Sequence, residues 1–352
     1  MRSFDYKRTC NEVLSNEIVK ILTEIYELKG KVDYFIDNEE LDFANMKRIA
    51  RINSIEAGCR ITNVTVPRKD IDYMLDNNEM VDNDNPHCYV AGYHDALSYI
   101  FDDSTVTLNS DTILEVANLT TKYLYFNENE YRNRGFERNV RFLRPWEYYN
   151  NKNYNAVDGK DVLKCINSIC SEFAICLNDK VVDMLIPICL FFTDFLAIYP
   201  FNQSSEKVSK LLIPYLLKVC GFSIGEYISI EEIIYENLES FYQIWEVSMK
   251  DWQEDSNDYK EMTKFILRVV LRAYEKFSDF IDLHNNGMSK TERIEYILKD
   301  RGYETTKREL IELCPDISDT TIEITLGSLL RSGKVEKVGG GRYTSYVYKY
   351  HH

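Results

Sequence analysis

Hydrophobic positions recur at helical spacing through most of this chain. Between residues 17 and 37, apolar side chains fall three or four positions apart, at Ile18, Ile21, Leu22, Ile25, Leu28, Val32 and Phe35. This spacing places them on one face of an α-helix. Similar patterns predict helices at residues 43–56, 86–101, 112–124, 161–176, 179–198, 241–252 and 258–283. We therefore predict a mainly α fold.

The end of the chain has a different pattern. Residues 284–289 contain a glycine and few apolar side chains, which predicts a linker. Short helical patterns follow at 290–300, 306–313 and 318–331, and then two alternating segments, 334–338 and 342–348, flank three glycines. Three helices and a glycine-tipped hairpin resemble a winged helix-turn-helix. We predict an N-terminal helical region (1–85), a core domain (86–283) and a winged helix domain (288–350).

Composition narrows the class of protein. The chain of 352 residues is 45% hydrophobic and 13% aromatic, enough for a packed core. Its formal net charge of −15 disfavours broad binding to nucleic acid, unless basic side chains gather on one face. Nine cysteines without a CxxC pair fit buried thiols in a reducing compartment. We expect a cytoplasmic protein with no signal peptide and no membrane span, because the longest apolar stretch, Val181–Ile198, is interrupted by Asp183, Pro187 and Asp194.

The most informative segment is Tyr199–Lys210. An apolar run ends at Pro200, a polar loop follows, and a second apolar run begins after Ser209 and Lys210. This order predicts a helix, a tight loop and the N-terminus of a second helix. The unpaired backbone N–H groups of a helix N-terminus can hold an anion.

The segment resembles the signature of the Fic (Fido-fold) family, His-Pro-Phe-x-Asp/Glu-Gly-Asn-Gly-Arg-x-x-Arg, whose members transfer AMP from ATP to hydroxyls of target proteins. Pro200 and Phe201 match the signature. The other positions differ: Tyr199 stands at the catalytic His, Gln203 at the magnesium carboxylate, Ser204, Ser205 and Glu206 at Gly-Asn-Gly, and Lys207 and Lys210 at the arginines. The resemblance covers about residues 15–282 and implies a helical Fic core with a small β-hairpin flap.

These differences remove most of the chemistry that the resemblance implies. Tyr199 has a reference pKa near 10 and is a poor general base, whereas histidine at about 6.5 is a good one. Gln203 is neutral and a weak ligand for Mg²⁺. Glu206 brings negative charge to the phosphate site. Ser204, Ser205, Lys207 and Lys210 remain candidates for binding a nucleotide or another anion. We expect no cofactor, and ATP with Mg²⁺ only if the site is active.

Residues 54–64 resemble the segment that carries the family's inhibitory motif, Ser/Thr-x-x-x-Glu-Gly/Asn, whose glutamate pairs with a motif arginine. In the preferred register the glutamate falls on Thr62, Asn63 matches, and the arginine partner is Lys207. A second register uses Glu56 as the glutamate. Both halves of the ion pair are changed in the first register. An equal alternative to the inhibitory motif is that these residues form an ordinary surface helix.

By position, Gly135–Phe142 resembles the Fic flap, an edge that pairs with target peptides by adding a strand. The flap candidates are Arg138, Asn139 and Val140, and the implied partner is a target protein.

The winged helix implies DNA binding, with residues 318–331 as recognition helix. Asp319 and Glu323 argue against base readout by that helix. The basic candidates are Arg331, Lys334, Lys337 and Arg342. A protein-interaction or homodimerisation module is an equal alternative.

The sequence thus favours a Fic-type protein with a degraded motif that acts by binding or regulation. The alternatives are an active AMP, nucleotidyl or phosphate transferase with a changed donor, and a DNA-binding transcriptional regulator.

Overall fold

The computed structural model describes residues 2–38, 41–77, 86–102, 106–124, 129–133, 157–179, 183–202, 204–341 and 344–349. Contacts divide the chain into two compact units. The first comprises Met1–Tyr26 and Ala50–Ala273, and the second comprises Glu27–Ile49 and Tyr274–His352. The helices α2 (Asn16–Asn38), α3 (Ala44–Ile61) and α13 (Lys260–Asn285) contribute to both units. The three domains predicted from the sequence divide the chain differently and stay a prediction.

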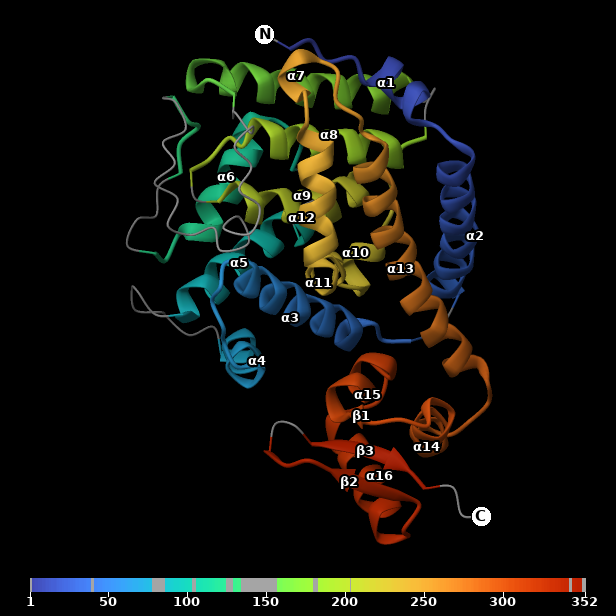
Figure 1. The fold of residues 1–352 in the computed structure, drawn as a ribbon. Helices are drawn as coiled ribbons and strands as arrows, with labels where there is room; N and C mark the ends of the chain where they lie inside the picture. Colours follow the sequence, from blue (N-terminus) through green and yellow to red (C-terminus); the bar gives the residue numbers. More distant parts are fainter. Residues whose placement is uncertain are drawn as a thin grey trace. The chain divides into compact units, whose positions relative to one another are not determined.

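The predicted mainly α fold is confirmed (Figure 1). The remaining helices of the first unit are α1 (Tyr6–Val13), α4 (Arg68–Asn77), α5 (Pro86–Asp102), α6 (Ser110–Thr121), α7 (Gly159–Asp179), α8 (Leu185–Ile198), α9 (Ser205–Val219), α10 (Ile224–Tyr227), α11 (Ile230–Glu236), α12 (Leu238–Met249) and a 3₁₀ turn at Trp252–Glu254. The sequence patterns missed α1, α4 and α10, which are short. The helix predicted at 179–198 begins instead at Leu185, where the Asp183 carboxylate accepts the Leu185 N–H at 2.9 Å.

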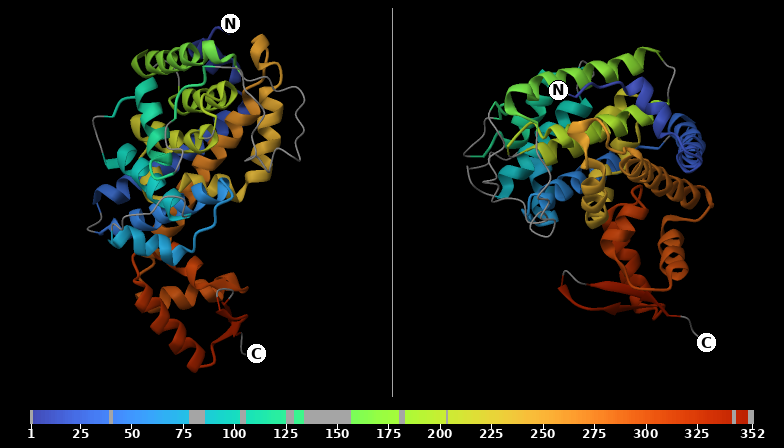
Figure 2. Two further views of the ribbon diagram at one scale, coloured as in Figure 1. Left: turned by 90° about the vertical axis from the view of Figure 1, so that its left-hand side faces the viewer. Right: turned by 45° about the horizontal axis from the view of Figure 1, so that its top comes forward.

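Helix α8 is the centre of the first unit. All of its residues are buried, as expected for a helix that is apolar on every side. It packs against α1, α7, α9 and α12. Figure 1 shows α7, α8 and α9 one below another, and Figure 2 shows the same helices from two further directions. The C-terminus of α8 leads directly into the segment 199–210.

One charged side chain lies inside this apolar helix. Asp194 is fully buried, and its Oδ1 accepts hydrogen bonds from Trp252 Nε1 and from the Tyr259 hydroxyl, both at 2.7 Å. Burial raises the pKa of Asp194, and the nearby Arg2 guanidinium opposes that shift. Arg2 lies over the Trp252 ring at 4.7 Å and donates to the Tyr259 hydroxyl at 2.6 Å. The N-terminal segment thereby helps to accommodate the buried acid.

The second unit has its own small core and sheet. Its elements are α14 (Lys290–Arg301), β1 (Thr305–Thr306), α15 (Lys307–Leu313), α16 (Asp319–Arg331), β2 (Val335–Val338) and β3 (Ser345–Tyr348). The antiparallel sheet has the order β1-β3-β2, with Val335 opposite Tyr348 and Thr305 opposite Tyr346. The sequence predicted β2, β3 and the three helices, but missed β1. Its core comprises Ile294, Ile297, Leu298, Leu310, Cys314, Ile317, Ile322, Leu326, Leu329 and Val335.

Capping residues set the helix starts in this unit. Ser289 with Glu292, and Thr306 with Glu309, form reciprocal capping boxes at α14 and α15, and Ser318 caps α16. Within the described ranges, none of the helices combines the length and apolar character needed to cross a bilayer.

Candidate functional site

The turn between α8 and α9 has an unusual backbone conformation. Tyr199 follows the last residue of α8 in the left-handed region, with φ 49° and ψ 65°, and its N–H donates to the Phe195 carbonyl at 3.0 Å. Positive φ is uncommon for a bulky residue. Tyr199 is only 4% exposed. At the position of the family's general base, the structure therefore places a buried phenol that ends a helix.

Arg132 holds the end of α8. Its Nε donates to the Tyr199 carbonyl at 2.6 Å, its Nη2 donates to the Ile198 carbonyl at 2.8 Å, and its backbone N–H donates to the Pro200 carbonyl at 2.9 Å. The side chain is buried among backbone oxygens, including that of Val157 at 3.1 Å. A cation at a helix C-terminus is favourable, since the last carbonyls lack intrahelical partners. Sequence reasoning missed Arg132 because it lies 67 residues before Tyr199 and belongs to no motif.

Phe201 and Ser205 form the inner part of the loop. Phe201 is fully buried, and its ring stacks on Tyr131 at 5.0 Å between centroids. The Ser205 Oγ accepts the Phe201 N–H and donates to the Phe201 carbonyl, both at 2.7 Å. Ser204 donates to the Asn129 side-chain oxygen at 2.7 Å. Both serine hydroxyls at the family's phosphate loop thus hold the turn together.

Lys210 is fully buried and paired within its own helix. Its Nζ lies 3.4 Å from the Glu206 carboxylate and 3.3 Å from the Glu206 carbonyl. The Tyr242 hydroxyl donates to the same carboxylate, and the Phe241 ring lies 4.7 Å from the ammonium. Burial lowers the pKa of Lys210, while Glu206 acts in the opposite direction. Glu206 therefore neutralises one of the two lysines at the arginine positions.

Lys207 has a different environment. It is 5% exposed, and its ammonium lies 5.2 Å from the Tyr89 ring centroid. Among the described residues it has neither a carboxylate partner nor a hydrogen-bond acceptor for its side chain. Burial lowers its pKa from 10.5 to about 8, and the neighbouring Cys59 on α3 only partly offsets this. Within the described part of the chain, no acidic side chain compensates the buried charge of Lys207.

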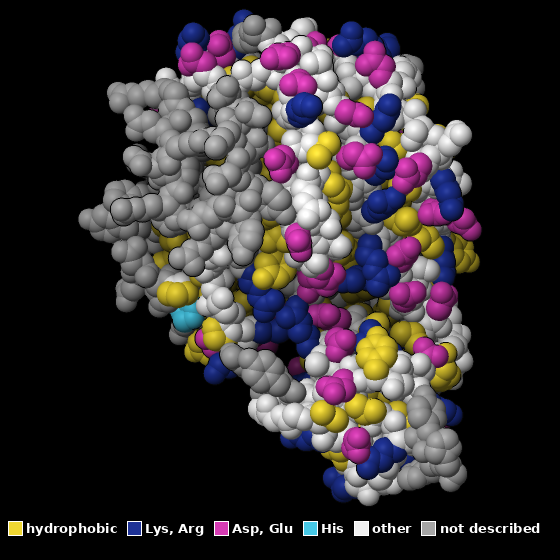
Figure 3. Space-filling view, viewed as in Figure 1, with side chains coloured by type: hydrophobic (Ala, Val, Ile, Leu, Met, Phe, Trp, Pro, Cys, Tyr) yellow, Lys and Arg dark blue, Asp and Glu magenta, His cyan; other side chains and the backbone are white. Residues whose placement is uncertain are grey.

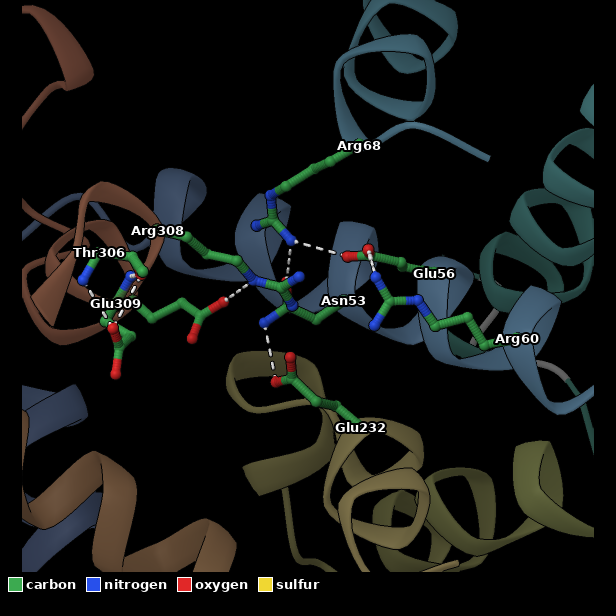
Figure 4. Close-up of polar contacts among 9 residues, drawn as sticks. Asn53, Glu56, Arg60, Arg68, Glu232, Thr306, Arg308 and Glu309 are labelled. Atoms are coloured by element: carbon green, nitrogen blue, oxygen red, sulfur yellow. Dashed lines mark hydrogen bonds and ion pairs between the residues drawn. The ribbon is translucent and has the colours of Figure 1, made fainter. Parts of the chain in front are cut away.

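The two registers of the inhibitory motif fall at different places on α3. Thr62 and Asn63 follow its last turn: the Thr62 hydroxyl donates to the Cys59 carbonyl at 2.8 Å, and Asn63 has φ 58°. Glu56, the alternative, is a buried carboxylate between Arg60 and Arg68, the latter at 3.4 Å (Figure 4). In the preferred register, the motif residues thus lie at the end of α3. In the alternative register, the motif glutamate is Glu56, whose carboxylate is already neutralised by Arg60 and Arg68.

Three sets of candidates lie outside the described residues: Gln203, the flap residues Arg138, Asn139 and Val140, and Arg342. Where the chain is described, no group of His, Cys, Asp and Glu side chains is arranged to hold a metal ion. The residues present do not fit a magnesium–triphosphate complex, because the Ser205 hydroxyl and the Lys210 ammonium already have partners within the chain.

The basic residues of the second unit are partly neutralised. Lys334 lies 2.7 Å from Glu295, and Lys307 lies 2.6 Å from Glu323 and 3.4 Å from Asp319. Arg331 and Lys337 are exposed. Figure 3 shows acidic side chains beside basic ones on the right-hand part of the surface in view, which is not grey. Of the basic candidates Arg331, Lys334 and Lys337, Lys334 is thus paired with an acidic side chain.

Solved structures resemble this chain over most of its length. A Fic family protein from Desulfovibrio desulfuricans G20 matches 96% of this chain and 97% of its own, with a TM-score of 0.60 and 17% identity. A Fic domain containing signaling protein from Bacteroides thetaiotaomicron VPI-5482 matches 74% of this chain and 95% of its own, with a TM-score of 0.52 and 12% identity. No family model and no curated protein matches the sequence. At these identities the likeness establishes the fold: the chain has the Fic fold.

Replacing Arg132 should destabilise the first unit. In Arg132→Met, the carbonyls of Ile198 and Tyr199 lose a charged donor while they stay buried, so we expect a loss of about 2–4 kcal/mol in the free energy of unfolding by urea. The exposed Arg8 provides the control, since Arg8→Met should change the free energy of unfolding by less than about 0.5 kcal/mol. Equal effects of the two substitutions would contradict the role given to Arg132.

Replacing Lys207 should stabilise the protein near neutral pH. Because its folded pKa of about 8 is below the unfolded value of 10.5, the cost of burying the charge is fully present below pH 8. That cost falls as pH rises from about 8 to 10.5, so the contribution of Lys207 to stability increases with pH. Lys207→Met should raise the free energy of unfolding at pH 7 by on the order of 3 kcal/mol at most, and by progressively less toward pH 10.

Lys210→Met is the matched control, because it leaves the largely buried Glu206 carboxylate without its cation and should destabilise the protein at pH 7. A Lys207→Met variant that is also destabilised at pH 7 would show that Lys207 is compensated.

Proposed function

We propose that this protein is a Fic-fold binding or regulatory protein in which the motif turn serves as a scaffold instead of transferring AMP. The observation that carries the proposal is the cluster that the buried Lys210 and Tyr242 form with the largely buried Glu206 carboxylate, at the position of the phosphate cradle. A triphosphate there would have to displace Glu206, because like charges repel strongly where water is excluded.

The remaining motif residues support the same conclusion. The phenol of Tyr199 would have to lose a proton with a reference pKa near 10 to act as a base. The hydroxyls of Ser204 and Ser205 are engaged with Asn129 and Phe201. General base catalysis alone contributes about 10²–10⁴ in rate. Together with the neutral Gln203, these changes make ordinary AMP transfer the less favoured function.

On this proposal the protein acts on a target protein by contact. The segment that includes Arg138, Asn139 and Val140 is the candidate for binding it, through addition of a strand. A reducing cytoplasmic setting, expected from the nine cysteines, is part of the proposal.

A transferase with a changed donor is the second candidate. Lys207 favours it, since an unpaired buried ammonium near the N-terminus of α9 is suited to receive an anionic group. The donor would differ from ATP with Mg²⁺, because the residues around Lys210 do not fit that complex.

A DNA-binding regulator is the third candidate. It is supported by the order of α14, α15, α16 and the β2–β3 hairpin, which resembles a winged helix. The exposed face of α16 carries Glu323 and the 65% exposed Ile324, which suits a protein partner or a second copy of the chain as well as it suits DNA.

Incubation with labelled ATP and Mg²⁺ or Mn²⁺ tests the main proposal. We expect no label on the protein or on bound partners, and no change in melting temperature with ATP, because base, metal ligand and cradle are all replaced. Label that accumulates with turnover and disappears in Tyr199→Phe would refute the proposal, whereas label that persists in Tyr199→Phe does not arise from a base at this position.

Thermal shifts with ATP, ADP, CTP and CDP-alcohols test the second candidate. A shift that is lost in Lys207→Met but retained in Lys164→Met would support a changed donor. The absence of any shift would remove that candidate.

Retention of duplex DNA tests the third candidate. Because Lys334 and Lys307 are neutralised, we expect no retention at about 50 mM salt, the low end of the range in which phosphate contacts dominate. The variant Glu323→Lys removes one acid beside Lys307 and serves as the positive comparison. Salt-dependent retention of the unmodified protein, reduced by Lys337→Ala, would favour a DNA-binding function.

A further inference from the structure

The guanidinium of Arg2 lies in a cage of aromatic and polar groups. Its carbon is 4.7 Å from the centroid of the Trp252 ring and 5.6 Å from that of Tyr259. One nitrogen donates to the Trp252 carbonyl. Another donates to the Tyr259 hydroxyl at 2.6 Å and lies 3.3 Å from the Asp255 carboxylate. Aromatic faces, a carboxylate and several acceptors suit the planar fork of a guanidinium better than the point charge of an ammonium.

The groups around Arg2 are held in place by the rest of the first unit. The buried Asp194 carboxylate of α8 accepts from Trp252 Nε1 and from the Tyr259 hydroxyl, both at 2.7 Å. Trp252 begins the 3₁₀ turn, and the aspartates on either side of that turn, Asp251 and Asp255, both have φ 56°. Positive φ is uncommon outside glycine, although aspartate adopts it more often than most residues. The cage is therefore formed by α8, this turn and the start of α13, and Arg2 only fills it.

The segment that carries Arg2 is held mainly by side chains. Figure 1 shows the link between α12 and α13 beside this segment. Within the described ranges, the backbone of residues 2–4 makes no hydrogen bond to another part of the chain. Ser3 and Asp5 are exposed, and the Phe4 ring lies 6.1 Å from that of Trp252. Segments with few backbone hydrogen bonds open at a low cost in free energy. Arg2 and Phe4 thus contact the cage as a bound peptide would.

We propose that Trp252, Asp255 and Tyr259 form an arginine-binding site, which Arg2 fills as a displaceable ligand within the chain. When Arg2 leaves, the site takes an arginine from a partner protein. Because Phe4 contacts Trp252 two positions after Arg2, the partner segment carries an aromatic residue two positions after its arginine. The net charge of −15 and the Asp255 side chain, which is 43% exposed, attract such a basic segment.

Exchange of the occupant affects α1 and leaves α8 in place. The Tyr259 hydroxyl donates to Asp194 whichever arginine it accepts from, so the wall of the site persists. Segment 2–5 loses its anchor, and α1 begins directly after it, at Tyr6. The inference does not rest on the proposed function, because none of these contacts involves the segment 199–210.

The test measures the binding of two fluorescent peptides to the full chain by anisotropy. Their sequences are Arg-Ser-Phe-Asp, as in residues 2–5, and Lys-Ser-Phe-Asp, each with blocked ends. Arg2→Ala opens the site, so it should bind the arginine peptide at least about tenfold more tightly than the unmodified protein does, where Arg2 competes at a high effective concentration. Arg8→Ala changes an exposed arginine of α1 and should bind as the unmodified protein does.

Two comparisons assign the binding to the cage. The lysine peptide should bind Arg2→Ala at least about tenfold more weakly than the arginine peptide, because an ammonium lacks the fork. Adding Asp255→Asn to Arg2→Ala should weaken the arginine peptide, since asparagine adopts positive φ but carries no charge. Equal binding of the two peptides, no gain in Arg2→Ala, or no loss with Asp255→Asn would overturn the proposal.

Amide exchange on the unmodified protein does not depend on the folding of a variant. Arginine peptide at millimolar concentration should speed the exchange of residues 6–13 at least several-fold, because α1 loses the anchor that Arg2 provides. The lysine peptide at the same concentration should leave the exchange unchanged. Exchange that the arginine peptide does not alter would show that Arg2 is a fixed structural contact, and would also overturn the proposal.

Discussion

The structure depends on the burial of α8, a helix that is apolar on every face and has no contact with water. A helix in this position gains its stability from packing, but its last carbonyls cannot find solvent. Arg132 meets that constraint by donating to the carbonyls of Ile198 and Tyr199. The left-handed Tyr199 then turns the chain, and Phe201 enters the core against Tyr131. The geometry of the segment 199–210 follows from this arrangement.

Within that geometry, the residues at the family's catalytic positions serve the fold. Ser205 bridges both backbone groups of Phe201, Ser204 binds Asn129, and Glu206 neutralises Lys210. Each of these side chains could contact a ligand in another context. Here a ligand would first have to displace contacts within the protein. Its binding free energy would have to exceed the cost of breaking them, because a buried polar group cannot be left unpaired without cost. The backbone path of the segment 199–210 is thus held by contacts within the protein.

The two lysines of the motif show how local surroundings decide the role of a charge. Lys210 has a carboxylate one turn away and a phenylalanine ring beneath it. Lys207 has only the Tyr89 ring among the described residues, and burial depresses its pKa. A protein seldom retains an unpaired buried cation without a reason, since burying such a charge costs a large part of the free energy of unfolding of a typical protein. Lys207 is therefore the residue of this segment on which the second candidate function, a transferase with a changed donor, depends.

Four features could be predicted from the sequence: the mainly α fold, the starts of the helices that follow Ser289 and Thr306, the β2–β3 hairpin, and the order of helix, loop and helix around the segment 199–210. These features depend on local periodicity, capping side chains and residues close in the chain, which a single sequence displays. The packing of the helices was needed to show that Arg132 closes α8 and that Tyr242 joins Glu206. The physical reason is that each of these contacts joins side chains far apart in sequence, and packing of whole helices brings them together after local preferences have been satisfied.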